Sequence, residues 1–315
     1  MALVEALSDD QVRGIRRLAE RSLERDGVEA LNEQTLLNLD RAPGPGFYHF
    51  VLGSGDDVTG YAQMEIADGD AHAEMTVDPD HRREGHGRRL MEDLVTTATG
   101  EAEFLRLWAH GDTSAAQKVA ESEGFSRDRV LFELGMDASQ MDWPESWPEG
   151  AGEWPTGSAP AAVLPQGFSL RHFDPGTDED ELVRVNAAAF ADHPEQGRWT
   201  FEDVITREQE EWFDPEGIIL AFQGDALRGF HWTKMVPENG AGIVGEIYVV
   251  GIDPPAQGTG LGKVLTLAGM AHMAARGATT LTLFVDESNS RAVRLYRNQG
   301  FETVRTDVQY KRPLE

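Results

Sequence analysis

The sequence predicts an α/β protein made of two tandem domains, each a sheet with helices on both of its faces. Its 315 residues are enough for two separate hydrophobic cores. One loop-to-helix motif occurs twice, at 77–90 and again at 252–265. Strand-like and helix-like segments follow each other in the same order in both halves. We therefore expect an N-terminal domain over 1–140 and a C-terminal domain over 167–315.

The two copies of this motif align without gaps. In each, an apolar strand is followed by Asp-Pro, by Arg or Gln, by a loop with spaced glycines and by an amphipathic helix. Such a loop points several backbone N–H groups, supported by a helix N-terminus, toward a bound anion. The duplication therefore predicts two anion-binding loops.

The elements around the second copy follow from its apolar periodicity. A strand over 243–252 precedes the loop, and Leu261, Val264, Leu265 and Ala268 then fall on one helical face. We further expect a strand over 280–285, a helix over 290–298 that ends at Gly300, and a strand over 301–311 that closes the sheet. The corresponding segments of the first half are 71–77, 87–99, 104–109, 114–122 and 130–136.

Between the halves lies a segment rich in proline, glycine and tryptophan. It contains three Trp-Pro pairs, at 143–144, 147–148 and 154–155. Because proline is excluded from the interiors of regular helices and sheets, we expect a linker over 141–166. The tryptophans indicate that it packs along a surface.

The composition bounds the class of protein. Apolar residues make up 40% of the chain and charged residues 26%, as in soluble globular proteins. No apolar run approaches the ~18 residues that span a bilayer, and no signal peptide is expected. The chain has no cysteine, which excludes disulfides, thiolate metal sites and a cysteine nucleophile. We expect a cytoplasmic protein without a bound metal.

The formal net charge of −27 argues against a nucleic-acid partner, because phosphates require basic patches. Two interpretations of the acidity remain open: a generally acidic surface, or long-range attraction of a cationic amine substrate. In either case an anionic ligand must be held by local donors. Backbone amides of the two loops, with Arg82, Arg83, Arg88 and Arg89, are the candidates.

The pattern Arg/Gln-x-x-Gly-x-Gly after a strand resembles the acetyl-CoA diphosphate loop of the GNAT N-acetyltransferases. A Rossmann loop comes early in its unit, whereas these loops come late, and Gly262-Lys263-Val264 does not match a Walker loop. A purely structural glycine turn is the remaining alternative. The resemblance implies two tandem GNAT (acyl-CoA N-acyltransferase) domains, each a mixed, mostly antiparallel sheet flanked by helices. It also implies that acetyl-CoA lies where the fourth strand splays from the fifth, beside a bulge that offers backbone N–H groups to the thioester carbonyl.

Acetyl transfer to an amine requires a base for the amine and an acid for the leaving thiolate. Glu246, on the strand before the second loop, is the candidate base, and Tyr296, on a later helix, is the candidate acid. In the first half, counting back 175 or 176 residues assigns Ala71 to the position of Glu246, Thr113 to that of Asn289 and Ala120 to that of Tyr296. We therefore expect a catalytic C-terminal domain and an N-terminal domain that binds acetyl-CoA without turnover. The alternatives are that Glu246 is a surface residue of an edge strand and Tyr296 an ordinary core aromatic.

The whole chain resembles the mycothiol synthases, a family of tandem-GNAT enzymes of actinobacteria. The resemblance is carried by 186–190 with 193–197, by 229–234 and by 245–252, while Asn32-Glu33-Gln34 resembles an N-terminal counterpart of 193–197. It implies transfer of acetyl from acetyl-CoA to the cysteinyl amine of Cys-GlcN-Ins (a cysteine joined to glucosaminyl-inositol), giving mycothiol and CoA.

The same resemblance implies roles for individual residues. Glu246 is the general base, acting through water, and Tyr296 is the general acid. Glu33, Glu195, Lys234, Glu246 and Phe284 bind the polar substrate, although Phe284 stands where a tyrosine is expected and Glu195 and Lys234 also fit a solvated surface. The cofactor-binding residues implied in the second half are Val250, Gly251, Ile252, Gln257, Gly258, Thr259, Gly260, Leu261, Gly262, Lys263, Asn289, Ser290, Arg291, Ala292, Val293 and Arg294. Those implied in the first half are Met75, Thr76, Val77, Arg82, Arg83, Glu84, Gly85, His86, Gly87 and Arg88, among which Glu84 and His86 are unusual in a phosphate loop.

Other functions remain open from the sequence. A tandem GNAT enzyme that acetylates an aminoglycoside or a protein N-terminus fits the same residues, because carboxylates and a lysine suit many polar amines. A non-enzymatic acetyl-CoA sensor, in which both halves only bind, belongs to a different class. The expected partners are acetyl-CoA and Cys-GlcN-Ins, with no nucleic acid or membrane, and the expected state is a monomer.

Overall fold

The computed structural model describes residues 2–4, 6–40, 44–141, 164–191, 196–238 and 242–314. The chain forms two compact units. Unit 1 contains Met1–Phe132, Asp286–Ser288 and Arg305–Glu315, and unit 2 contains Glu133–Val285 and Asn289–Val304. Most of the predicted linker, residues 142–163, lies outside the described residues. In the described part of the chain, no helix is both long and apolar enough to cross a membrane.

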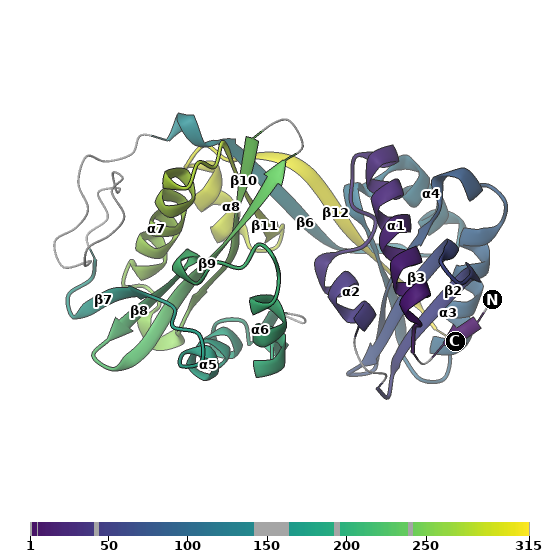
Figure 1. The fold of residues 1–315 in the computed structure, drawn as a ribbon, viewed down its shortest axis with the longest axis horizontal. Helices are drawn as coiled ribbons and strands as arrows, with labels where there is room; N and C mark the ends of the chain where they lie inside the picture. The colour runs from purple at the N-terminus through teal and green to yellow at the C-terminus, as the bar shows by residue number, and fades with distance from the viewer. Residues whose placement is uncertain are drawn as a thin grey trace. The chain divides into compact units, whose positions relative to one another are not determined.

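The described residues of unit 1 form a mixed sheet in the strand order β1-β2-β3-β4-β5-β12 (Figure 1). Its strands are β1 (Ala2–Val4), β2 (Phe47–Ser54), β3 (Asp57–Ala67), β4 (Asp70–Val77), β5 (Phe104–Ala109) and most of β12 (Glu302–Pro313). Its helices are α1 (Asp9–Asp26), α2 (Glu33–Leu37), α3 (His86–Ala98) and α4 (Ser114–Ser122), with short 3₁₀ turns that include η3 (His110–Asp112). Paired neighbours are antiparallel except β4 and β5, which run parallel.

The described residues of unit 2 repeat this plan with the order β6-β11-β10-β9-β8-β7. The strands are β6 (Ser126–Asp137), which enters this unit at Glu133, β7 (Phe168–His172), β8 (Ile218–Gln223), β9 (Ala226–Glu238), β10 (Gly242–Ile252) and β11 (Thr280–Asp286). The helices are α5 (Glu179–Ala189), α6 (Phe201–Glu208), α7 (Leu261–Ala275) and α8 (Ser290–Arg297). Strands β7 to β10 are antiparallel, and β10 and β11 are parallel.

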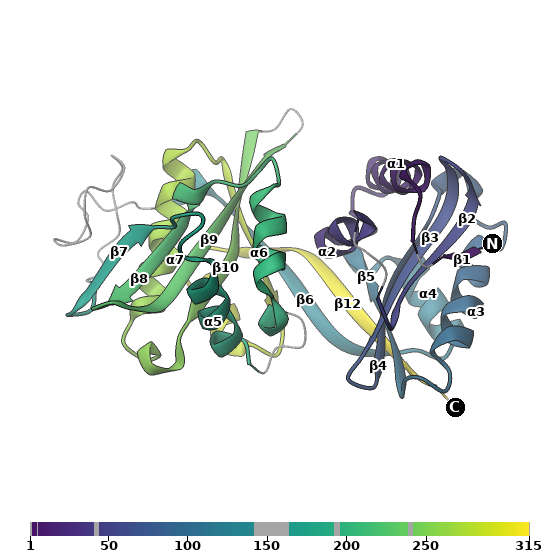
Figure 2. The same cartoon turned by 60° about the horizontal axis from the view of Figure 1, so that its bottom comes forward.

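Helices cover both faces of each sheet (Figure 2). In unit 1, α3 packs its buried Leu90 and Leu94 on one face, and α1 packs Ile15 and Leu18 on the other. This arrangement, with the mostly antiparallel pairing, confirms the predicted α/β fold.

The same layering holds in unit 2. Val264 and Leu265 of α7 pack against Ala221 on one face, and Leu182 of α5 packs on the face that carries Trp232. The predicted strands 104–109 and 280–285 and the predicted helix 114–122 agree with β5, β11 and α4.

The internal repeat predicts that the last strand, β12, closes the sheet of unit 2, but the structure differs. Residues from Val308 to Pro313 of β12 pair antiparallel with β5, from Ala109 to Phe104, and so complete the sheet of unit 1. The prediction that 301–311 closes the sheet of the second half was therefore wrong. The physical reason is that strand pairing is made by backbone hydrogen bonds, which any segment with a suitable apolar alternation satisfies.

Candidate active site

The two glycine loops have the same backbone conformation. The amide of Asp253 donates to the carbonyl of Arg228 over 2.9 Å, and the amide of Asp78 donates to that of Thr59 over 3.0 Å. Each loop then ends at a left-handed glycine that begins a helix, Gly260 with φ 92° before α7 and its unit 1 counterpart with φ 91° before α3. The first N–H groups of such a helix have no partner inside the helix, so both loops present donors to solvent.

The residue before each glycine loop ties it to its strand. In unit 1, Nε of Arg82 donates to the carbonyl of Val77 over 3.3 Å, and in unit 2 Nε2 of Gln257 donates to that of Ile252 over 3.3 Å. The predicted diphosphate residues Arg82 and Gln257 therefore share a structural role. One residue later both loops adopt a left-handed φ, of 67° at Arg83 and of 79° at Gly258, so here they differ in residue type and not in conformation.

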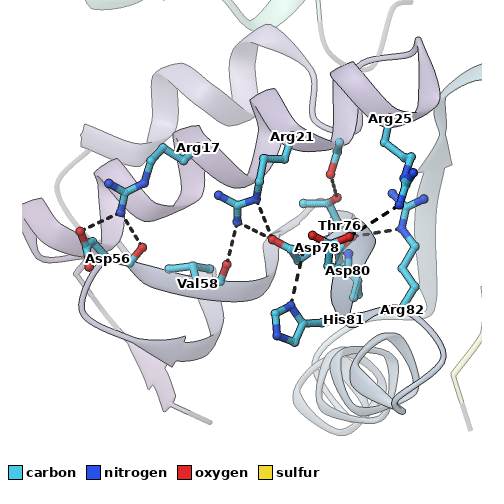
Figure 3. Close-up of polar contacts among 12 residues, drawn as sticks. Arg17, Arg21, Arg25, Asp56, Val58, Thr76, Asp78, Asp80, His81 and Arg82 are labelled. Carbon is cyan, nitrogen blue, oxygen red and sulfur yellow. Dashed lines mark hydrogen bonds and ion pairs between the residues drawn. The ribbon is translucent and has the colours of Figure 1, made fainter.

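Four ion pairs link α1 to the segments around the loop of unit 1, and Figure 3 shows those of Arg17, Arg21 and Arg25. They join Arg17 to Asp56, Arg21 to Asp78, Arg25 to Asp80 and Arg82 to Asp26. The guanidinium of Arg82 makes two bonds to Asp26, of 2.8 and 2.6 Å, and this carboxylate raises the pKa of Arg82. A diphosphate bound at this loop must therefore compete with Asp26 for the predicted arginine.

The parallel strands of each unit open toward the loop. In unit 2 the pairing of β10 with β11 ends at Ile247 opposite Leu283, although β10 continues to Ile252. In unit 1 the pairing of β4 with β5 ends at Ala73 opposite Leu107. Among the described residues, the pairing of β10 with β11 and of β4 with β5 does not continue beyond these points, as expected for strands that splay.

In the described residues, the strand pair β9–β10 has a bulge beside the opening, and the equivalent pair of unit 1, β3–β4, has none. Its pairing with β9 shifts between Ile247 and Val249, which leaves Tyr248 as an extra residue. The equivalent pairing of β3 with β4 runs without a shift from Gly60 opposite Val77 to Ala67 opposite Asp70. The bulge is thus a difference between the units.

This bulge corrects the residue count between the two halves. Glu246 lies opposite Lys234 of β9 and Thr282 of β11. The residue of β4 in the same place, opposite Glu65 of β3 and Arg106 of β5, is His72.

The prediction that Ala71 corresponds to Glu246 was therefore wrong, because the gapless count passed over the extra residue. Ala71 is fully buried in the core beneath α3. Unit 1 keeps an ionisable side chain, His72, at the position of the candidate base.

The candidate acid lies where the sequence count places it. The amide of Phe301 donates to the carbonyl of Tyr296 over 3.1 Å, and that of Phe125 donates to Ala120 over 2.8 Å, so the two helix ends match. Tyr296 is 9% exposed and packs edge-on against Phe301 at 5.6 Å between ring centroids. Burial raises the pKa of Tyr296 to about 12, opposed by a hydrogen bond with Thr266. A phenol with this pKa is protonated at neutral pH and can donate a proton.

Asn289 begins the helix that carries this tyrosine. Its side-chain oxygen accepts from the amide of Ala292 over 3.1 Å, which caps α8. In unit 1, the hydroxyl of Thr113 accepts from the amide of Ala116 over 3.2 Å and caps α4. The two residues correspond, as predicted from the sequence count, and both are helix caps.

The remaining cofactor-binding candidates of unit 2 lie at the end of β10, in the glycine loop, at the start of α7 and at the start of α8. Gln257 to Gly260 and Lys263 are exposed, as are Asn289 to Arg291 and Arg294. Gly251 leaves no room for a side chain, because a Cβ there would lie 2.4 Å from the ring of Phe230. Among those of unit 1, Arg82 to Gly85 and Arg88 are exposed, whereas Thr76 is buried and its hydroxyl is 3.2 Å from that of Ser22.

Several substrate-binding candidates lie on the face of unit 2 that α5 and α6 cover. Lys234 and Glu246 are directly opposite each other, and Phe284 follows Thr282 by two residues on β11, so all three side chains share this face. Phe284 is 39% exposed and accessible to a ligand. The ammonium of Lys234 lies 4.8 Å from the ring centroid of Trp212.

Two other substrate-binding candidates are placed differently. Glu195 lies outside the described residues. The next residue, Gln196, is held to the fully buried Asn186 by two bonds: Nδ2 of Asn186 donates to its backbone carbonyl over 2.6 Å, and its Nε2 donates to the Asn186 side chain over 3.2 Å. Glu33 is the first residue of α2 in unit 1.

Sequence reasoning missed a buried charge cluster in unit 1. His110 lies 3.0 Å from Glu74 through Nε2 and 3.0 Å from Asp307 through Nδ1. Burial lowers the pKa of His110, but the carboxylates of Glu74 and Asp307 raise it to about 10. Glu74 follows the last paired residue of β4, so this cluster lies where β4 and β5 separate. His110 and Asp307 are 197 residues apart in the chain, so no sequence motif contains this cluster.

Sequence reasoning also missed Arg207 of α6, which is only 3% exposed. Its Nε donates to the hydroxyl of Tyr248, the extra residue of the bulge, over 2.8 Å. The apolar periodicity of the helix does not predict that one of its arginines is buried, so this contact could not be predicted from the sequence.

Comparisons with known proteins agree with this geometry. Residues 185–301 match the model of the acetyltransferase (GNAT) family, and residues 45–127 match that of an acetyltransferase (GNAT) domain. Both matched segments include a glycine loop, so the chain has two GNAT domains.

Among solved structures, the chain resembles a tandem GNAT protein from the clavulanic acid biosynthesis pathway, with a TM-score of 0.69 at 17% identity, over 100% of this chain and 98% of that chain. It also resembles a GCN5-related N-acetyltransferase from Sphaerobacter thermophilus, with a TM-score of 0.63 at 24% identity, over 99% of this chain and 96% of that chain. These likenesses support the tandem GNAT fold.

Curated relatives are more similar. The mycothiol acetyltransferase of Thermobispora bispora is 45% identical over 94% of both chains. Those of Stackebrandtia nassauensis and Thermobifida fusca are 44% identical over 99% of this chain, and over 98% and 97% of their own lengths. With two GNAT domains and this identity over nearly its whole length, the chain belongs to the mycothiol acetyltransferase family.

Proposed function

We propose that this protein transfers the acetyl group of acetyl-CoA to the cysteinyl amine of Cys-GlcN-Ins, giving mycothiol and CoA, and that it does so as a monomer. One observation carries the assignment of the chemistry to unit 2. There the strand opening, the bulge of β10 and Tyr296 occur together. Unit 1 has an opening, but its β4 is regular and Ala120 replaces the tyrosine.

Acetyl-CoA fits the loop before α7. Gly258 and Gly260 have φ of 79° and 92°, with no neighbour within 4 Å of the place of a Cβ, so the backbone is open to a ligand. We propose that the loop from Gln257 to Lys263 holds the diphosphate through amides other than those of Gln257 and Lys263, which already donate to Pro254 and Gly260. We further propose that Val250 to Ile252 hold the acetyl arm beside the opening. Asn289 to Arg294, at the start of α8, border the same arm. The thioester supplies the acetyl group in this reaction.

In the proposed mechanism, Glu246 accepts a proton from the substrate ammonium through a water molecule, which leaves a nucleophilic amine. The amine nitrogen bonds to the carbonyl carbon, and the developing oxyanion is stabilised by backbone N–H groups at the bulge. The C–S bond then breaks, and Tyr296 donates its phenolic proton to the thiolate. The nitrogen, which carries one proton too many after it bonds to the carbonyl carbon, releases that proton to solvent water. The tyrosinate takes up a proton from solvent, and Glu246 returns its proton to solvent before the next turnover.

The acceptor is proposed to lie on the face shared by Lys234, Glu246 and Phe284. The aromatic side of Phe284 offers a surface for the apolar face of a sugar ring. The charges of Lys234 and Glu246 offer hydrogen bonds to hydroxyls and to the amine. Glu195 and Glu33 are proposed as further contacts, and the first loop, from Arg82 to Arg88 with Met75 to Val77, as a second acetyl-CoA site.

The experiment that tests this function measures thiol release from acetyl-CoA with different amines. We expect fast release with Cys-GlcN-Ins, and release slower by about two orders of magnitude or more with glucosamine, an aminoglycoside or an N-terminal peptide, because each lacks polar groups that the site binds. A faster reaction with an aminoglycoside or a peptide would replace the proposed acceptor. Acetyl-CoA binding without release for any amine would identify a sensor instead of an enzyme.

A further inference from the structure

A bulge provides N–H groups beside the thioester only if its conformation is held in place. The extra residue of a bulge interrupts the ladder of backbone bonds, so the sheet alone constrains it weakly. On one side of the bulge, β10 has also lost β11 as a partner, since their pairing ends at Ile247. The groups that hold the bulge must therefore come from outside the ladder.

The side chain of the extra residue is tightly surrounded. The ring of Tyr248 lies 5.1 Å from that of Trp212, 5.6 Å from that of Trp232 and 6.0 Å from that of Trp199, measured between centroids. Trp232 is fully buried on β9, and these rings belong to the core between the sheet and helices α5 and α6. The aromatic packing places the ring of Tyr248, and its hydroxyl then needs a polar partner.

That partner is Arg207 of α6. Nε of Arg207 donates to the hydroxyl of Tyr248 over 2.8 Å, and one terminal nitrogen donates to the carbonyl of Asp203 over 2.9 Å. Its guanidinium carbon lies 4.2 Å from the ring centroid of Trp199. A guanidinium that is 3% exposed is costly unless its N–H groups are bonded, so its orientation is well determined.

We propose that Arg207 is a positioning residue for acetyl transfer, which holds the hydroxyl of Tyr248 and thereby aims the backbone N–H groups of the β10 bulge at the thioester carbonyl. Arg207 acts through Tyr248 and touches no reacting atom. The inference rests on the proposed function, in which the opening beside the bulge receives the acetyl group. It also gives a reason for the difference between the units, because the regular β4 needs no such support.

The first test replaces the hydroxyl and keeps the ring, with Tyr248→Phe. We expect kcat to fall about 10- to 100-fold, because a shift of the donors by a fraction of an ångström weakens oxyanion stabilisation. The KM for acetyl-CoA should stay within about threefold, since the diphosphate loop supplies uniform binding. Tyr48→Phe is the matched control: its hydroxyl bonds Glu101 over 3.2 Å at the surface of unit 1, and its loss should leave kcat unchanged.

The second test measures polarisation of the bound thioester directly. With ¹³C-labelled acetyl-CoA and no amine, the infrared carbonyl stretch should move to lower frequency on binding to the wild-type protein. The shift should shrink in Tyr248→Phe and in Arg207→Met, and Arg207→Lys should restore little of it because a lysine lacks the Nε geometry. A merely structural arginine would change the melting temperature and leave this frequency unmoved.

Two outcomes would overturn the proposal. The first is a carbonyl frequency that stays at the wild-type value in both Tyr248→Phe and Arg207→Met at full acetyl-CoA occupancy. The second is independent losses of kcat in the two single variants that multiply in the double variant. Positioning through one contact predicts that Arg207→Met with Tyr248→Phe loses no more than Arg207→Met alone. Because the infrared measurement needs no acceptor, it distinguishes this proposal from the proposed function. A wild-type shift that the variants lose, without turnover of Cys-GlcN-Ins, supports the positioning role while rejecting the acceptor.

Discussion

Lys234 and Glu246 form a pair of opposite charges at directly opposed positions of β9 and β10. Such pairs stabilise a sheet by about 0.2–1 kcal/mol, which is too little to explain a functional role by itself. Their importance lies in their place, one residue before the paired ladder of β10 and β11 ends. At the residue scale, chemistry is therefore decided by where a side chain stands relative to the opening.

The first prediction concerns the proposed base. Glu246→Gln keeps the size of the side chain and removes its ability to accept a proton, so kcat should fall by about 10²- to 10⁴-fold. Acetyl-CoA affinity, measured by calorimetry, should be unchanged. Glu302→Gln, a matched change at an exposed position of β12, should leave kcat unchanged. If Glu246→Gln keeps full activity, the base must be sought elsewhere.

The second prediction concerns the proposed acid. Tyr296→Phe should lower kcat with little loss of stability, since the ring that packs on Phe301 remains. Because the pKa of Tyr296 is raised to about 12, the wild-type rate should not decline through loss of this proton between pH 8 and 10. Tyr310→Phe in unit 1 is the control. A pH–rate profile in which the wild type and Tyr296→Phe coincide contradicts the assignment.

Glu246 and Tyr296 show which correspondences between the two halves can be predicted from the sequence. The correspondence of Tyr296 with Ala120 follows from spacing, because the helices that carry them have equivalent ends. The correspondence of Glu246 with His72 does not follow from spacing, because the extra residue Tyr248 shifts the count between the two halves by one. A one-residue shift turns a side chain to the other face of a sheet, so counting chose the buried Ala71 instead of His72.

At the scale of elements, the glycine loops show what local sequence determines. Gly260 has a φ of 92° and open space where a Cβ would stand, so its requirement is conformational. Gly262 lies in the first turn of α7, where a Cβ would have an ordinary contact of 3.5 Å with Ile252. The left-handed backbone therefore requires glycine at position 260, whereas the backbone and the space at position 262 also accept alanine.

This difference gives the third prediction. Gly260→Ala should cost about 1–2 kcal/mol, because an alanine is strained in the left-handed region. The cost should appear as weaker acetyl-CoA binding or a lower melting temperature of unit 2. Gly262→Ala should be tolerated, since alanine favours helix. Calorimetry and thermal unfolding of both variants test the pair, and an equal response of the two would contradict this explanation.

The cluster of His110 with Glu74 and Asp307 is an element-scale device that ties β4, η3 and β12 together. The pKa of His110 rises from 6.5 to about 10. A raised pKa means that the folded state binds the proton more tightly than the unfolded state. The resulting stabilisation is complete below pH 6.5 and is lost as the pH rises toward about 10.

The fourth prediction follows from this sign. The wild-type free energy of unfolding should decline between pH 6.5 and about 10, and His110→Gln should flatten that decline. At neutral pH the substitution should cost about 3–5 kcal/mol, because it removes the cation between two buried carboxylates, of which Asp307 keeps the ion pair with Arg305. Denaturant unfolding across this pH range measures both effects. A parallel pH dependence in the two proteins would show that His110 is not the titrating group.

At the scale of the whole molecule, the net charge of −27 acts on both substrates. Acetyl-CoA is an anion and is repelled at long range, whereas an ammonium-bearing acceptor is attracted. The donors that we propose for the diphosphate, in the loop before α7, therefore act against an unfavourable field. The net charge therefore predicts a measurable effect on the binding of both substrates, whatever the origin of the acidic composition.

The fifth prediction is an opposite salt dependence for the two substrates. Raising ionic strength from about 10 to about 150 mM shortens the screening length to about 8 Å. The kcat/KM for acetyl-CoA should then rise, and that for Cys-GlcN-Ins should fall. Sucrose at matched osmolarity is the control for effects that do not depend on charge. The same direction of change for both substrates would argue against control by the net field.

By itself the sequence determined the duplicated motif, the helices and strands around it, the left-handed glycines and the position of Tyr296. These features depend on residues close together in the chain, where periodicity and backbone preference act. Only the tertiary structure decided that β12 completes the sheet of unit 1, that β10 bulges at Tyr248 and that Arg207 and His110 are buried with their partners. Those outcomes depend on pairing and packing between distant segments, whose free energies are set by the whole core and leave no local pattern in the sequence.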